Sequence, residues 1–222
     1  MKRFLSVLIG LLAMVAAVSA QPVFGSRHDR FGSHYRQRRH PGGYSSWYCG
    51  LLVGATASHV TSDSDELSGN RLKTGWSLGA AAGFNLAPAI LVESGLYYAE
   101  KGGTSRNDDG RFSYELDYLE VPLMLKYNRY TASGVVLQPF VGAYLAMGVG
   151  GKIRDYRERE SFSSFGPSYF RHGDSGVKIG IGATYSVLHA SIGYDFGLAN
   201  IGRDEFSDTR NRALRLNVGF AF

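Results

Sequence analysis

The sequence is poor in cysteine and proline and has few long apolar runs. Among its 222 residues there are one cysteine, Cys49, and six prolines. A single cysteine cannot form an internal disulfide, so a disulfide-stapled secreted domain is excluded. After residue 20 no apolar stretch is long enough for a transmembrane helix, and the mean hydropathy is -0.13. A helical membrane protein is therefore also excluded.

The sequence is rich in glycine and aromatic residues. It contains 29 glycines, and 13% of its residues are Phe, Trp or Tyr. Aromatic residues favour strands, and glycine makes room where backbones and bulky side chains approach closely. This composition predicts an all-β fold.

The first 46 residues differ from the rest. Lys2 and Arg3 precede an apolar run that ends in the small residues Ser19 and Ala20, which predicts a secretory signal peptide over 1–20, with a membrane anchor as the alternative. Residues 21–46 are predicted to form a flexible basic arm, because five arginines face one acid there. The arm either contacts anions, such as lipid phosphates or an acidic partner, or is a solvated linker. The arm also contains His28, His34 and His40, and a metal site formed by these histidines is a less favoured alternative.

From Trp47 to Phe222, hydrophobicity alternates with a period of two in eight segments. We expect strands over 47–59, 73–86, 89–102, 114–127, 136–153, 175–187, 189–200 and 213–222. The connections near Pro88 and Leu188 are tight and 128–135 is modest, whereas 60–72, 103–113, 154–174 and 201–212 are long and polar. Short turns at one end and long loops at the other are typical of an outer-membrane barrel. The predicted fold over 47–222 is therefore an eight-stranded antiparallel transmembrane β-barrel.

The two faces of each segment indicate which side meets lipid. One face carries large apolar residues, and the other is rich in glycine with a few charged residues. Glycine weakens a solvent-exposed strand but fits the narrow interior of an eight-stranded barrel. We therefore expect the apolar face to be outside and six charges to pair inside, since unpaired buried charges are costly. These lumen charges are Glu93, Glu120, Lys126, Lys178, Asp195 and Arg215.

Three stretches are typical of one family of small barrels. The most specific is YLEVPLMLKY (118–127), and LVESGLYYAEKGG (91–103) and the terminal LRLNVGFAF (214–222) accompany it. With these stretches the sequence resembles the PorT-like outer-membrane β-barrel family of Bacteroidota-type bacteria. The resemblance implies an outer-membrane barrel with both termini in the periplasm. It also implies that Phe222 is a recognition signal for the barrel-assembly machinery. The family's namesake is linked to protein secretion across the outer membrane.

The favoured function is a structural or interaction role in the envelope. The expected partners are outer-membrane lipid, the barrel-assembly machinery and an envelope or secretion protein, contacted through the arm or through the aromatic- and arginine-containing loop 154–173. No cofactor, metal or nucleic acid is expected. A passive pore is one alternative, although side chains fill a barrel of this size. A lipid-modifying enzyme is another, with His59, His172 and His189 as candidate catalytic residues.

Overall fold

The computed structural model describes residues 47–62, 71–107, 110–155, 161–166, 169–203 and 208–222. The predicted signal peptide and arm, 1–46, lie outside the described residues. The strands are β1 (Trp47–Thr61), β2 (Arg71–Ala87), β3 (Ile90–Asn107), β4 (Gly110–Tyr127), β5 (Arg129–Tyr130), β6 (Val136–Gly150), β7 (Lys152–Asp155), β8 (Ser161–Ser163), β9 (Gly173–Tyr185), β10 (Leu188–Gly197) and β11 (Arg210–Ala221). Within these ranges there is no helix with the length and apolar character needed to span a membrane.

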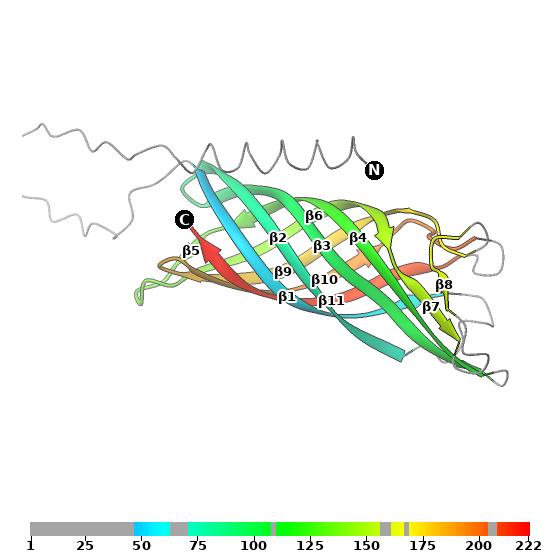
Figure 1. Cartoon of the computed structure of the whole chain (residues 1–222). Helices are drawn as coiled ribbons and strands as arrows, with labels where there is room; N and C mark the ends of the chain where they lie inside the picture. The colour runs from blue at the N-terminus through cyan, green and yellow to red at the C-terminus, as the bar shows by residue number, and fades with distance from the viewer. Residues whose placement is uncertain (1–46, 63–70, 108–109, 156–160, 167–168, 204–207) are drawn as a thin grey trace, which may run out of the picture. The chain divides into compact units, whose positions relative to one another are not determined.

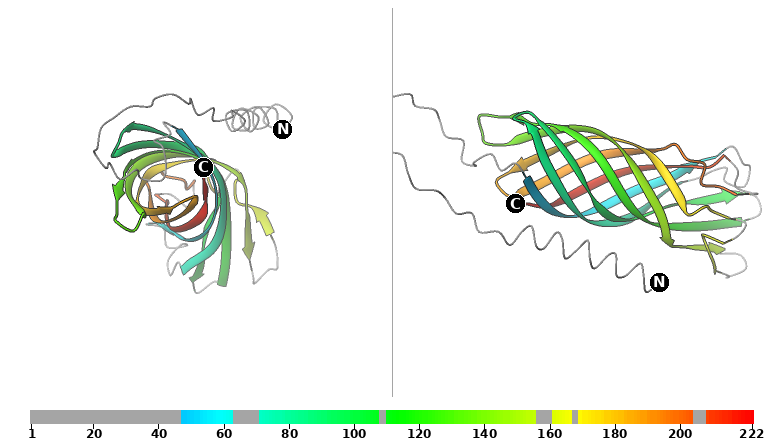
Figure 2. Two further views of the ribbon diagram at one scale, coloured as in Figure 1. Left: turned by 90° about the vertical axis from the view of Figure 1, so that its left-hand side faces the viewer. Right: turned by 90° about the horizontal axis from the view of Figure 1, so that it is seen from above.

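The long strands close into a barrel. β1, β2, β3, β4, β6, β9, β10 and β11 pair in that order, each antiparallel to its neighbours, and β1 pairs back to β11 (Figure 1). The closing seam is continuous from Gly50 opposite Ala221 to Thr61 opposite Arg210. Viewed from one end, the strands surround a central axis (Figure 2). The predicted eight-stranded antiparallel barrel is confirmed.

The two ends of the barrel differ in their connections. At the short-turn end, β3 follows β2 after Pro88 and Ala89, and β10 follows β9 after Ser186 and Val187. The second turn was expected at Leu188 but lies at Ser186 and Val187, where Ser186 adopts a left-handed backbone (φ 56°). At the opposite, long-loop end lie the connections that follow β1, β3, β7 and β10. Short turns face the periplasm and long loops the cell exterior in bacterial barrels.

The chain's last residue is tied into the seam at the short-turn end. The Phe222 N–H donates to the Cys49 carbonyl oxygen at 2.8 Å, and the Cys49 N–H donates to the Phe222 carbonyl oxygen at 2.8 Å. In Figure 1 the C-terminus lies beside the start of β1. Both ends of the barrel domain are therefore on the short-turn side.

Alternate residues form an apolar exterior. Leu145 on β6, for example, exposes 70% of its surface, while the flanking Tyr144 and Ala146 are buried. Aromatic pairs lie on this outer surface: the rings of Trp47 and Phe84 are 4.8 Å apart, as are those of Trp76 and Tyr98. A protein in water would not expose so continuous an apolar surface. The direction predicted for the two faces is therefore confirmed.

Interior glycines make room for aromatic rings. A Cβ on Gly79 would overlap the ring of Tyr97, and one on Gly83 would overlap the ring of Tyr48. These glycines lie on the inward face of β2, which the sequence showed as the small-residue face. They let two tyrosines fill the lumen from neighbouring strands.

Most of the segment 103–113, which was expected to be a loop, is strand, so this prediction was wrong. β3 continues to Asn107 and β4 starts at Gly110, so the two strands form a hairpin beyond the barrel. The hydrophobic alternation stops near residue 102, because lipid selects an apolar face only where a strand crosses the bilayer. Strand pairing continues without it.

The expected strand 136–153 is also corrected: it breaks at Gly151. Gly151 has φ +137° and Gly102 has φ +148°, and both flank Glu115 of β4 from opposite sides. Beyond this pair of irregularities β7 pairs with β4, and β8 pairs with β7. β8 and the two-residue β5 were not expected. We call β7, β8 and the ends of β3 (103–107) and β4 (110–114) the outer sheet.

Candidate functional site

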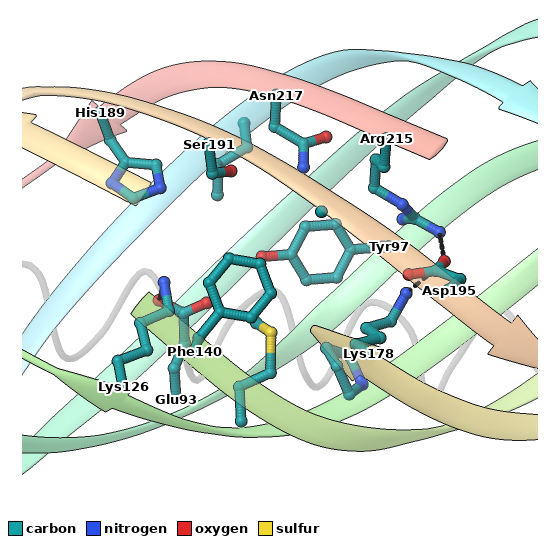
Figure 3. Close-up of a pocket in the computed structure, with 14 residues that line it drawn as sticks. Glu93, Tyr97, Lys126, Phe140, Lys178, His189, Ser191, Asp195, Arg215 and Asn217 are labelled. Atoms are coloured by element: carbon teal, nitrogen blue, oxygen red, sulfur yellow. Dashed lines mark hydrogen bonds and ion pairs between the residues drawn. The ribbon is translucent and has the colours of Figure 1, made fainter. Parts of the chain in front are cut away.

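All six charges predicted for the lumen lie inside the barrel and are buried. They come from five strands: Glu93 on β3, Glu120 and Lys126 on β4, Lys178 on β9, Asp195 on β10 and Arg215 on β11. The alternation of each strand directs these side chains inward, opposite the apolar face. They form two separate groups along the lumen, and Figure 3 shows five of the six, without Glu120.

The larger group is built around two carboxylates. Glu120 Oε2 lies 2.7 Å from Arg215 Nη2 and 3.2 Å from Lys178 Nζ. Asp195 Oδ2 binds the same two cations, at 2.8 Å from Arg215 and 2.6 Å from Lys178. Glu120 and Asp195 therefore bind the same two cations, Lys178 and Arg215. This arrangement cross-links β4 inside the barrel to β9, β10 and β11, which come much later in the sequence.

Sequence reasoning missed two members of this group, Lys101 and Asp174. Lys101 Nζ lies 2.6 Å from Glu120 Oε1, 3.6 Å from Asp174 Oδ2 and 4.5 Å from the centre of the Tyr144 ring. Asp174 Oδ2 also accepts hydrogen bonds from Tyr144 (3.2 Å) and Asn211 (2.9 Å). Lys101 lies in the expected strand 89–102, whereas Asp174 lies at the end of the expected loop 154–174, one residue before the expected strand 175–187. Lys101 lies eight positions after Glu93 and Asp174 four before Lys178, so each shares an inward face.

The smaller group is the pair of Lys126 and Glu93, with Nζ and Oε2 2.5 Å apart. A cavity of about 40 Å³ separates it from the larger group, with Tyr97, Phe140 and His189 in its lining (Figure 3). This volume admits a few water molecules at most.

The buried charges of the described interior balance. The acids are Glu93, Glu120, Asp174 and Asp195, and the bases are Lys101, Lys126, Lys178 and Arg215. A buried ion is stable only with a counter-charge and hydrogen bonds, and each of these eight has an ion-pair partner. The lumen is therefore a neutral, cross-linked polar core.

Apolar side chains fill the long-loop end of the lumen. Phe170 and Ile201, from the connections after β8 and β10, are buried against Tyr114, Leu116 and Tyr118 of β4. The rings of Tyr114 and Phe170 are 5.5 Å apart, and Phe170 pairs with Gly202 through a backbone bridge. We call this cluster the outer seal. Hydrophobic alternation could not have located it, because loop residues that fold back have no period.

The three candidate catalytic histidines lie apart. His59 is on β1 near the long-loop end. His172 Nδ1 lies 2.9 Å from the Gly148 carbonyl oxygen, and its ring stacks on Phe165 at 4.8 Å. His189 Nδ1 lies 2.9 Å from Thr184 Oγ1. No group of three or more metal-ligating side chains occurs among the residues that the structure describes.

Phe222, the expected assembly signal, projects outward with 61% of its surface exposed. Its side chain makes no contribution to the backbone pairing with Cys49. We expect Phe222→Ser to lower the amount of folded protein in the outer membrane severalfold while export across the inner membrane continues. Fractionation followed by heat-modified gel mobility measures this. Phe220→Ser is the matched control, since Phe220 is equally outward but not terminal. Equal losses in both variants would contradict a terminal signal.

Comparison with known proteins agrees with this architecture. Residues 31–203 match the family described as outer membrane protein beta-barrel domain. No curated protein sequence matches significantly. Among solved structures, the chain is similar to the attachment invasion locus protein Ail of Yersinia pestis (15% identity, TM-score 0.44, covering 80% of this chain and 100% of that one). It is also similar to OprG from Pseudomonas aeruginosa (13% identity, TM-score 0.48, covering 80% and 96%). The family match covers most of the sequence, so the chain is an outer-membrane protein and belongs to the outer membrane protein beta-barrel domain family.

Proposed function

We propose that this barrel is a membrane anchor that presents a binding surface at its long-loop end to a protein partner of the envelope. The observation that carries the proposal is the filled interior. Eight paired charges, a cavity of about 40 Å³ and the outer seal occupy the lumen. Because the lumen is filled, we expect binding to take place on surfaces outside it.

The outer sheet and the connection after β8 offer such a surface. Phe162 on β8 is exposed, and its ring centre lies 6.5 Å from that of Tyr169. β8 ends the order of strands, so its outer edge has no neighbouring strand among the described residues. Exposed aromatic side chains are enriched in protein interfaces, and loops held by a rigid scaffold commonly carry function.

The resemblance to PorT-like barrels supports a role in protein secretion or envelope assembly. The partner would then be an envelope or secretion protein, while outer-membrane lipid and the barrel-assembly machinery would serve insertion. This role requires neither a cofactor nor catalysis. A passive pore would require the charge groups to separate and the outer seal to open. A lipid-modifying enzyme would require the separated histidines to find new partners.

Site-specific photo-cross-linking in intact cells tests the proposal. A photoreactive amino acid replaces Phe162 in one variant and Leu145 in the other. Both positions are exposed, but Leu145 faces lipid on β6. We expect one reproducible protein adduct from position 162 and none from position 145. Mass spectrometry of the adduct identifies the partner.

Two outcomes would contradict the proposal. The first is the absence of any protein adduct at position 162 when the folded barrel is present at normal levels. The second is conductance above leak when the purified, folded protein is placed in a planar bilayer, because a filled lumen does not conduct. The second result would favour the pore.

A further inference from the structure

The lipid-facing side of β11 changes from apolar to basic towards the long-loop end. Its outward residues Leu214, Leu216, Val218 and Phe220 are exposed and apolar. The next two outward positions are Arg212 and Arg210. The inward positions between them are buried, as Asn211 and Ala213 show. The two arginines therefore continue the lipid-facing stripe and point away from the lumen.

The position of Arg212 corresponds to the outer boundary of the hydrocarbon. A strand rises about 3.3 Å per residue. With a tilt of about 40°, an apolar band about 25 Å tall spans about ten residues. Counting this length from Phe222 at the short-turn end reaches Arg212. Both arginines thus lie where lipid headgroups begin.

The neighbouring strands hold Arg212 in place. Arg212 lies opposite Phe196 on β10 and His59 on β1. Its Nη1 donates a hydrogen bond to the Gly197 carbonyl oxygen at 3.3 Å, and its guanidinium lies 5.5 Å from the centre of the Phe196 ring. The ring and the carbonyl fix the plane of the guanidinium and leave donors available. Figure 1 shows β10, β11 and β1 side by side in this wall.

The described carboxylates do not pair with the two arginines. In the part of the chain that the structure describes, neither Arg210 nor Arg212 forms an ion pair with a carboxylate. Two other cations near the long-loop end are paired. Lys73 on β2 lies 3.1 Å from Glu100 and 3.0 Å from Glu115, and Arg154 on β7 lies 3.6 Å from Glu115. Arg210 and Arg212 differ from Lys73 and Arg154 in having no described carboxylate within ion-pair distance.

We propose that Arg210 and Arg212 form a binding site for the phosphorylated headgroup of an outer-leaflet lipid. The guanidinium fork matches two phosphate oxygens, and cations at a membrane surface attract anionic headgroups. Below the arginines, Leu214 and Phe196 offer an apolar surface to the acyl chains of the same lipid. The site does not depend on the partner proposed above, because it faces the membrane.

Titration of the purified, folded barrel with diphosphorylated lipid A tests this site. Native mass spectrometry in detergent micelles measures the apparent Kd. We expect the double variant Arg210→Gln/Arg212→Gln to bind roughly 25-fold more weakly, since each surface cation contributes roughly fivefold to binding an anionic lipid surface. Lipid A stripped of both phosphates should bind the wild type as weakly as diphosphorylated lipid A binds the double variant. Arg154→Gln is the matched control, because Arg154 is already paired.

The outcomes separate the site from its alternatives. Unchanged affinity in the folded double variant, or an equal loss in Arg154→Gln, would overturn the proposal. Displacement of lipid A by millimolar orthophosphate would also overturn it, because it would indicate a small-anion site. If the double variant does not fold, Arg210→Gln alone serves, since this side chain is exposed. A loss of about fivefold is then expected, and unchanged affinity would overturn the site.

Discussion

Glu120→Gln should destabilise the barrel by about 3–5 kcal/mol, the cost of breaking a buried charge arrangement by removing one partner. The substitution keeps the shape of the side chain and removes its charge. Glu120 is fully buried and contacts Lys101, Lys178 and Arg215. Without it, these three cations share only Asp195 and Asp174, and the described lumen acquires a net positive charge. Urea unfolding in lipid vesicles, followed by gel mobility, measures the loss.

The matched control is Glu115→Gln on the same strand. Glu115 pairs with Lys73 and Arg154, but its side chain retains 24% of its exposure. Water can replace these contacts, so we expect a change below about 1 kcal/mol. Equal effects in the two variants would show that the interior network contributes no more than a surface ion pair.

The barrel was predictable because lipid imposes a simple pattern on each strand. Wherever a strand crosses the bilayer, one face must be apolar, and the narrow lumen then requires small or polar residues on the other. The stripe from Leu214 to Phe220 and the glycines Gly79 and Gly83 follow this rule. Six lumen charges could be placed inside by the same alternation of inward and outward residues. Lys101, near the end of an expected strand, and Asp174, at the end of the expected loop 154–174, obey it too but were not predicted.

The long-loop end was not predictable in the same way. Outside the bilayer neither face of a strand is selected by lipid, so the hairpin of β3 and β4 beyond Gly102 has no hydrophobic period. The outer seal depends on Phe170 and Ile201 folding back over Tyr114, a contact between residues distant in sequence. The break between β6 and β7 depends on the positive φ of Gly151, which the sequence alone does not reveal. The geometry of the proposed partner surface is set by these features.

The alternation of inward and outward residues also predicts the cost of placing a charge on the outer face. Ile181→Arg should destabilise the folded barrel by about 2–4 kcal/mol, the penalty for an arginine on the lipid face near the bilayer midplane. Ile181 lies on β9 opposite Ile192 and Pro139, and it is exposed to lipid. The flanking Gly180 and Gly182 face the lumen, so no rotamer brings the guanidinium inside. The same vesicle unfolding assay measures the effect.

Ser186→Arg serves as the comparison for Ile181→Arg, because it adds the same side chain to the same hairpin at a different depth. Ser186 lies in the turn after β9 and is exposed at the short-turn end. There the guanidinium reaches water or headgroups, so a cost of about 0–1 kcal/mol is expected. Serine and arginine both carry a Cβ, so the left-handed backbone of the turn penalises them alike. If Ile181→Arg were as harmless as Ser186→Arg, the wall at β9 would face water. The depth of the barrel in the membrane would then differ from the depth that its apolar outer surface indicates.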